Sequence, residues 1–387
     1  MSGKRIELVD ALRGYALFGL LLVHCYERFE VYWLDPKPDI WVHVIAGIFG
    51  GKAYAIFALL FGFSFATIMA NERERGGDFS LRFAWRLVLL ALIGLFHQAF
   101  YSGEILQVLA LIGLLLIPAD RISSNRLLLA LALIAFLQLP LWLQAYAASQ
   151  NAAWALALPA FWIDPSRMVM IEGGFSDVAR ANFQYGVASK WSFYWATGRV
   201  AQIAGLFLVG MVLQRSRLFA EAGQRLRTWL AVLVISAVFW IAMYQAMQSV
   251  EMPWPEEGAS PMQAMAITWA LEQWSQLSAM AFQVAAFVLL WQLGAEKLLR
   301  QFVAPGRMTL TLYVGQSLVL VPLFYGYGAG LYGNFSNAQV VLLGIAFFAL
   351  QILIAVQWFK LFRYGPLEWI WRAATRTSLQ VPMRRTD

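Results

Sequence analysis

The sequence predicts an all-α membrane protein: a polytopic helical bundle of about ten transmembrane helices, with both chain ends in the cytoplasm. Of its 387 residues 60% are hydrophobic and only 13% are charged, whereas a soluble protein needs about a quarter of its residues charged. Apolar runs of about 20 residues, the length that crosses a bilayer, recur along the chain. Lysines and arginines also gather on one side of the predicted membrane, as the positive-inside rule requires.

Ten apolar runs pass the length test, and the fourth follows the third so closely that the two are expected to form a tight helical hairpin. The predicted spans are residues 8–29, 41–69, 82–101, 103–118, 127–147, 191–213, 226–248, 264–293, 308–325 and 338–361.

The distribution of charge supports this span count. With ten spans and both ends on one side, 22 of the 29 lysines and arginines lie on that side, which is therefore predicted to be cytoplasmic. The net charge of +7 follows from this topology and from attraction to anionic headgroups, so the expected partner is the lipid bilayer and no nucleic acid.

We expect one transmembrane domain over residues 1–387, with an N-terminal part at 1–147 and a C-terminal part at 191–387. The external loop between them, residues 148–190, is rich in aromatic residues such as Phe161 and Trp162. These side chains are predicted to lie at the membrane interface or to roof the bundle.

Ionisable residues inside the predicted spans are costly in hydrocarbon and are candidates for function. Arg13 and His24 lie 11 residues apart on the first span, which places them on one face of the helix about 16 Å apart. Arg86 and His97 repeat the spacing on the third span. Imidazole accepts and returns protons near neutral pH, which suits it to general-base catalysis. The alternative interpretation is that the arginines anchor the topology and the histidines are core residues.

Further polar side chains lie within or beside the spans. Lys52, Arg199 and Glu104 are predicted at membrane depth, Glu272 belongs to a polar stripe on the eighth span, and Tyr313 belongs to a shorter stripe on the ninth. Hydrogen bonds between helices explain the two stripes as well as a cavity does. Charges at that depth need partners, so we predict a solvated cavity that opens to the outside.

Several chemistries lack support in the sequence. A single cysteine, Cys25, makes neither an intramolecular disulfide nor a thiolate metal site. The sequence has no P-loop, HExxH or GxSxG motif. The three histidines lack the spacing of metal ligands, so no metal is expected.

Three blocks of sequence, one at the start and two near the end, resemble a known family. The opening LVDALRGYALFGLLLVH and the C-terminal blocks PGRMTLTLYVGQSL and RYGPLEWIWR are similar to the YeiB-like bacterial multi-pass membrane proteins, a family with a domain of unknown function. The likeness covers most of the chain and is weakest over 130–190 and 245–265. It implies a location in the bacterial cytoplasmic (inner) membrane.

The YeiB-like family is remotely similar to the acyltransferase-three family and to heparan-glucosaminide N-acetyltransferase. This resemblance implies transfer of an acyl group, with acetyl expected, from cytosolic acyl-CoA to an outward-facing hydroxyl or amine of a sugar or envelope component. Arg13 and His24 match the spacing of the acyltransferase-three catalytic signature, although many YeiB-like proteins have Asn in place of His24. Arg13, with Arg82 and Arg86, is predicted to hold the CoA phosphates.

Within this hypothesis His24, or His97, acts as general base on the acceptor. Glu104, where the family tends to have Asp, is predicted to orient or charge-stabilise His97. The predicted oxyanion or substrate contacts are Lys52, Arg199, Glu272 and Tyr313.

Two other functions remain open. The same charges suit a transporter or channel for a small or anionic solute, with His24 and Glu104 as proton-coupled gates. A binding, sensor or assembly role without turnover is the third possibility. Close approach at Gly47 and Gly51 would support helix pairing, within one chain or in a homodimer.

Overall fold

The computed structural model describes residues 6–251, 260–378 and 380–385, and it is helical throughout, with 79% of the chain in helices. The first half comprises α1 (Glu7–Tyr26), η1 (Arg28–Leu34), α2 (Ile40–Phe49), α3 (Ala53–Arg73), α4 (Ser80–Gln98), α5 (Leu106–Gly113), α6 (Leu116–Asp120), α7 (Asn125–Phe136), α8 (Leu139–Ser149), α9 (Ala153–Leu156), α10 (Ser166–Glu172) and α11 (Phe175–Ala181). The second half comprises α12 (Val187–Ala196), α13 (Arg199–Arg215), α14 (Leu226–Gln248), α15 (Met262–Leu290), α16 (Glu296–Leu299), α17 (Val303–Arg307), α18 (Thr309–Phe324), α19 (Asn337–Leu361) and α20 (Pro366–Arg376).

Among the described residues, seven helical segments are long and apolar enough to cross a membrane, or eight if the bent pair α11–α12 and α13 forms one span. The prediction of a multi-pass helical membrane protein is confirmed at this level, but the count of ten is not. The predicted span 103–118 divides into α5 and α6, of 8 and 5 residues. The predicted span 308–325 forms α18, whose 16 residues reach about 24 Å and fall short of a hydrocarbon core of about 30 Å.

Three of the long segments are broken in the middle. The break between α2 and α3 lies at Gly50–Lys52, and Gly51 there has a φ of 74°. Gly198, with a φ of 75°, separates α12 from α13, and Gln138, with a φ of 55°, separates α7 from α8. Gly51 lies outside both α2 and α3, and a Cβ there would overlap the side chain of Gln276 on α15, whereas a Cβ on Gly47 would meet no atom within 4 Å.

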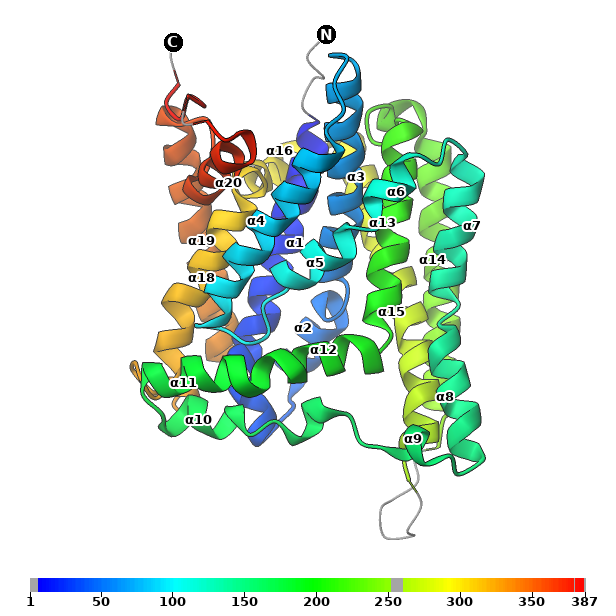
Figure 1. Ribbon diagram of the computed structural model, residues 1–387, viewed down its shortest axis with the longest axis vertical. Helices are drawn as coiled ribbons and strands as arrows, with labels where there is room; N and C mark the ends of the chain where they lie inside the picture. Colours follow the sequence, from blue (N-terminus) through cyan, green and yellow to red (C-terminus); the bar gives the residue numbers. More distant parts are fainter. Residues whose placement is uncertain (1–5, 252–259, 379, 386–387) are drawn as a thin grey trace.

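The two faces of the bundle differ. The start of α1 and the whole of α20 lie at one end, which we name the chain-end face (Figure 1). At the other end, the opposite face, α10, α11 and α12 run across the bundle (Figure 1). Most of the predicted external loop 148–190 is therefore helical. Phe161 and Trp162 line a cavity beneath it, as roofing residues would, whereas Trp154 is 61% exposed.

Side chains with oxygen acceptors fix several helix starts. Asp39 caps α2 by accepting the N–H groups of Trp41 and Val42 at 3.0 and 3.1 Å. Ser336 and Gln339 form a capping box at the start of α19. The carboxylate of Glu368 on α20 accepts the N–H of Leu310 at 2.7 Å and so joins the last helix to the start of α18.

Two helix crossings are close enough to require glycine on both partners. At the crossing of α1 and α17, a Cβ on Gly14 would overlap main-chain atoms of Phe302, and one on Gly306 would overlap main-chain atoms of Asp10. At the crossing of α3 and α13, Gly62 faces the main chain of Phe207 in the same way. Small residues allow backbones to approach within the membrane, where packing rather than hydrophobicity holds helices together.

Gly210→Ala is expected to lower the free energy of unfolding by about 1–3 kcal/mol, because its Cβ would overlap the carbonyl of Leu59 on α3. The measurement is thermal unfolding in detergent, followed by a thiol-reactive dye on the fully buried Cys25. Gly315→Ala is the matched control, since a Cβ there meets no atom within 4 Å. Equal melting temperatures for the two variants would contradict the close crossing.

Candidate functional site

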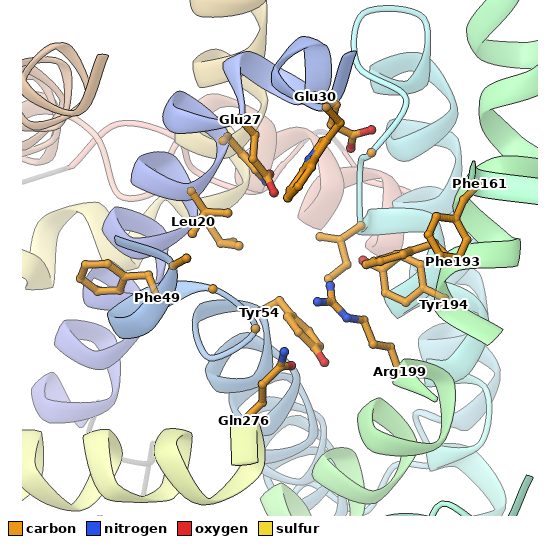
Figure 2. A pocket seen from close by; sticks show the side chains of 18 of the residues that line it. Leu20, Glu27, Glu30, Phe49, Tyr54, Phe161, Phe193, Tyr194, Arg199 and Gln276 are labelled. Carbon is orange, nitrogen blue, oxygen red and sulfur yellow. The ribbon is translucent and has the colours of Figure 1, made fainter. Parts of the chain in front are cut away.

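A cavity of about 780 Å³ lies in the half of the bundle near the opposite face. Its wall is built by the end of α1, the α2–α3 break, α12, the start of α13 and the middle of α15. Figure 2 shows its charged and aromatic side chains converging on a central space. Of the residues predicted from the sequence, His24, Lys52, Arg199, Glu272 and Tyr313 line it. A volume of this size accommodates a sugar or a comparable small molecule.

His24 and His97 lie on either side of the same two tyrosines. The His24 ring centroid is 5.2 Å from that of Tyr101, and the His97 centroid is 5.2 Å from that of Tyr313. His24 lines the cavity, whereas His97 is 0% exposed behind it. Nδ1 of His24 and both ring nitrogens of His97 are buried without a hydrogen-bond partner. Nε2 of His24 is not among the buried atoms, so it is the ring nitrogen through which His24 can meet a substrate in the cavity.

Glu104 bonds a lysine that was not predicted from the sequence. Its Oε1 lies 2.6 Å from Nζ of Lys190, and its Oε2 accepts the N–H of Leu106 at 2.7 Å. Lys190 also donates to Gln98 at 2.5 Å. Glu104 makes no hydrogen bond to His97, because its carboxylate bonds Lys190 and the start of α5.

Burial raises the pKa of the Glu104 carboxyl from its ordinary value, and the adjacent Lys190 ammonium opposes that shift. The pair is enclosed, with side-chain exposures of 0% and 2%. Lys190 also lines the cavity, so this ion pair connects the cavity wall to the segment between α4 and α5. Lys190 is the last residue of the predicted loop 148–190, a position that in the sequence does not indicate a buried charge.

A strained turn follows α1 and forms another part of the cavity wall. Arg28, Phe29 and Glu30 have φ angles of 47°, 52° and 91°, a conformation that non-glycine residues adopt only when the surroundings enforce it. Hydrogen bonds from Arg28 hold the turn in this conformation, because its guanidinium donates to the carbonyl of Phe335 at 2.8 Å and to Oδ1 of Asn337 at 3.1 Å.

The turn brings Glu27 and Glu30 to the cavity, where Figure 2 shows them on one wall. The Glu30 carboxylate accepts from the hydroxyl of Tyr101 at 3.2 Å. Neither acid was predicted as a site residue, because left-handed backbone at three successive non-glycine positions has no signature in the sequence.

The remaining cations near the cavity are held in different ways. Lys52 donates to the carbonyl of Ala46 at 3.1 Å. The guanidinium of Arg199 lies 4.7 Å from the ring centroid of Tyr54 and 4.5 Å from that of Phe193. Glu272 accepts from Gln276 at 2.6 Å on α15.

The three arginines predicted to bind CoA lie apart from this cavity. Arg13 donates to Asp10 at 2.8 Å and to Ser64 on α3 at 2.6 Å. Arg86 stacks 3.5 Å from the ring centroid of Trp371 on α20, and Arg82 is exposed. None of the three lines the 780 Å³ cavity or an apolar groove between α4, α18 and α20.

Metal chemistry has no support in this site: the described residues contain no group of three or more His, Cys, Asp or Glu side chains that would hold a metal ion. Fold and site together define a multi-pass helical membrane protein with a charged, histidine-bearing cavity near one face.

Comparison with known proteins agrees with that class. Residues 5–165 match the catalytic model of heparan-alpha-glucosaminide N-acetyltransferase, and residues 213–378 match a family described as a protein of unknown function (DUF418). Uncharacterized protein YxaH of Bacillus subtilis is 26% identical, with 100% of this chain and 98% of the relative aligned. Uncharacterized protein YeiB of Escherichia coli is 26% identical, with 99% and 100% aligned. The predicted resemblance to the YeiB-like proteins is confirmed.

Proposed function

We propose that this protein is a membrane-embedded acyltransferase, which moves an acyl group, acetyl by preference, from acyl-CoA to a hydroxyl or amine of a sugar or envelope component. The observation that carries the proposal is His24: it is the histidine that lines a sugar-sized cavity, and its Nε2 is the ring nitrogen that is not buried. Its helix also lies within the segment that matches an N-acetyltransferase catalytic model.

The proposal includes an orientation. The segments predicted to be cytoplasmic hold 22 of the 29 lysines and arginines, which favours a cytoplasmic chain-end face and an outward opening of the cavity. Relatives in Bacillus subtilis and Escherichia coli favour the bacterial cytoplasmic membrane. In this orientation the acceptor enters from outside and the acyl donor from the cytosol.

The chemistry assigned to His24 is that of a general base. His24 takes the proton from the acceptor hydroxyl or amine as its oxygen or nitrogen attacks the thioester carbonyl. The new C–O or C–N bond forms, the C–S bond breaks, and the proton passes from His24 to the departing CoA thiolate. The hydroxyl of Tyr313, which accepts the N–H of Ile105 at 3.3 Å, retains its own proton to donate to the oxyanion.

The CoA end of the reaction is proposed to use Arg13, Arg82 and Arg86, whose fixed positive charges suit phosphate groups. The Arg13 side chain is 22% exposed beside Asp10. The 11 residues from Arg13 to His24 correspond to about 16 Å along α1, which is the span that the pantetheine arm would bridge.

The experiment is calorimetric titration of acetyl-CoA into the detergent-purified protein and into Arg13→Ala and Arg82→Ala. We expect binding at micromolar concentration that is weakened at least about tenfold in each variant, because each loses a charge-assisted contact with phosphate. The exposed Arg180 on α11 provides the control Arg180→Ala. Absence of binding by the folded native protein would overturn the proposal.

One observation favours the transporter alternative. The segment formed by α11 and α12 makes a bend of 69° with α13 at the break between them. Broken helices line the solute sites of many transporters. Under that alternative, vesicles containing the protein take up an anionic solute without consuming acetyl-CoA. Acyl transfer predicts the opposite result, namely CoA release with no accumulation of solute.

A further inference from the structure

Arg199 is fixed at the break of a bent helix by two residues in left-handed conformation. Gly198 precedes it with a φ of 75°, and a Cβ there would overlap the carboxamide of Gln138. Gln138, itself at a φ of 55°, donates to the carbonyl of Gly198 at 3.2 Å. The residue at the break between α7 and α8 is thus hydrogen-bonded to the residue at the break between α12 and α13. This contact fixes the position of Arg199 at the start of α13.

The Arg199 side chain extends into the cavity, where its guanidinium lies between aromatic rings (Figure 2). Its two neighbours are the rings of Tyr54 and Phe193. Its Nε is buried with no hydrogen-bond partner. Among the described residues, no carboxylate lies within the 4.0 Å of an ion pair with it. A buried charge is costly unless it is paired, so this geometry leaves a place for an anion.

The acidic side chains that line the cavity are Glu27, Glu30, Asp164 and Glu272. Glu27 and Glu30 accept from the hydroxyls of Tyr26 at 3.4 Å and Tyr101 at 3.2 Å. Glu272 accepts from the amide of Gln276 at 2.6 Å, and Asp164 accepts the N–H of Ser166 at 2.9 Å. The N-terminus of the 17-residue helix α13 adds positive partial charge at Arg199. Arg199 is therefore a cation of the cavity wall whose closest described neighbours are aromatic rings and not carboxylates.

We propose that the acceptor carries an anionic group, which is a carboxylate, a sulfate or a phosphate, and that Arg199 binds it. The planar guanidinium presents two parallel N–H donors that match the oxygens of such a group. With its acidic group at Arg199, the acceptor directs its hydroxyl or amine to the part of the cavity that contains His24, Glu27 and Glu30. This inference rests on the proposed acyltransferase function, but it makes a separate prediction about binding.

Binding is tested with four sugars: glucosamine, glucosamine 6-phosphate, glucosamine 6-sulfate and glucuronic acid. Trp33, Trp162 and Trp240 line the cavity, so tryptophan fluorescence reports occupancy without turnover. We expect at least one acidic sugar to bind at least about tenfold more tightly than glucosamine, as a charge-assisted hydrogen bond allows. Comparison of the three acidic sugars identifies which anion the site takes.

Arg199→Gln is expected to remove the advantage of the acidic sugar over glucosamine, so that the ratio of the two affinities falls to about one. Arg199→Lys keeps the charge without the planar fork and is expected to retain only part of the advantage. Arg180→Gln, at an exposed arginine of α11, should match the native protein. Melting temperatures of the variants show whether each is folded.

The outcomes separate this inference from the function on which it rests. Equal binding of all four sugars, or an advantage that persists in folded Arg199→Gln, would overturn the anion site even if CoA is released from acetyl-CoA. Preferential binding through Arg199 without any CoA release would support the anion site and contradict acyl transfer. Failure of every sugar to bind would also overturn the anion site.

Discussion

Replacement of His24 by alanine is expected to reduce CoA release from acetyl-CoA by about 10²–10⁴-fold, the usual contribution of a general base. The reason is positional: His24 lines the cavity, whereas His97 is 0% exposed and packs against Tyr101 and Tyr313. The measurement is CoA thiol release by purified protein supplied with envelope glycans. The only protein thiol, Cys25, is fully buried and adds little background.

His43→Ala is the matched control for His24→Ala. His43 is exposed, its Nδ1 lies 2.7 Å from the carbonyl of Asp39, and it is absent from the cavity wall. Its replacement should leave the rate within about twofold of native. A His24→Ala protein that is folded and releases CoA at the native rate would remove His24 from the mechanism.

Breaking the ion pair of Glu104 and Lys190 is expected to have the largest effect on stability. Glu104→Gln or Lys190→Met alone leaves an uncompensated charge inside the bundle, at a cost of about 3–5 kcal/mol. The double variant should recover much of that loss, because neither charge is then left without its partner. Thermal unfolding followed through the reactivity of Cys25 measures all three variants.

The exposed pair of Glu221 and Arg225 provides the comparison. Its side chains are 29% and 43% exposed, so Glu221→Gln should cost less than about 1 kcal/mol. If the Glu104/Lys190 double variant melts as low as the less stable single variant, the two residues do not act as an energetic pair.

The sequence identified several cavity residues because charge inside a membrane is conspicuous. His24, Lys52, Arg199 and Glu272 come from different spans, and each is polar where hydrocarbon favours apolar side chains. Composition alone could not show that they share one cavity. That arrangement depends on the breaks at Gly51 and Gly198, whose left-handed backbone places Lys52 and Arg199 at the ends of helices.

The residues that sequence reasoning missed lie at the ends of spans, where a charge looks ordinary. Glu27 lies near the end of the predicted first span and Glu30 directly follows it, and Lys190 precedes the sixth, so all three resemble interfacial residues in the sequence. In the structure they face the cavity because η1 is strained and α12 runs across the bundle. The count of ten spans is not confirmed for a related reason: apolar runs predict helices, but they do not show where a helix breaks or stops short.

The strained turn after α1 connects the two regions of the chain that match family models. The regions matched by the two families are separate in sequence, at 5–165 and 213–378. Yet Arg28 is held by Phe335 and Asn337, and Phe29 accepts the hydroxyl of Tyr325 at 3.0 Å. A chimera that joins the first region of one relative to the second region of another must therefore preserve these contacts. Without them it would lose the turn that brings Glu27 and Glu30 to the cavity.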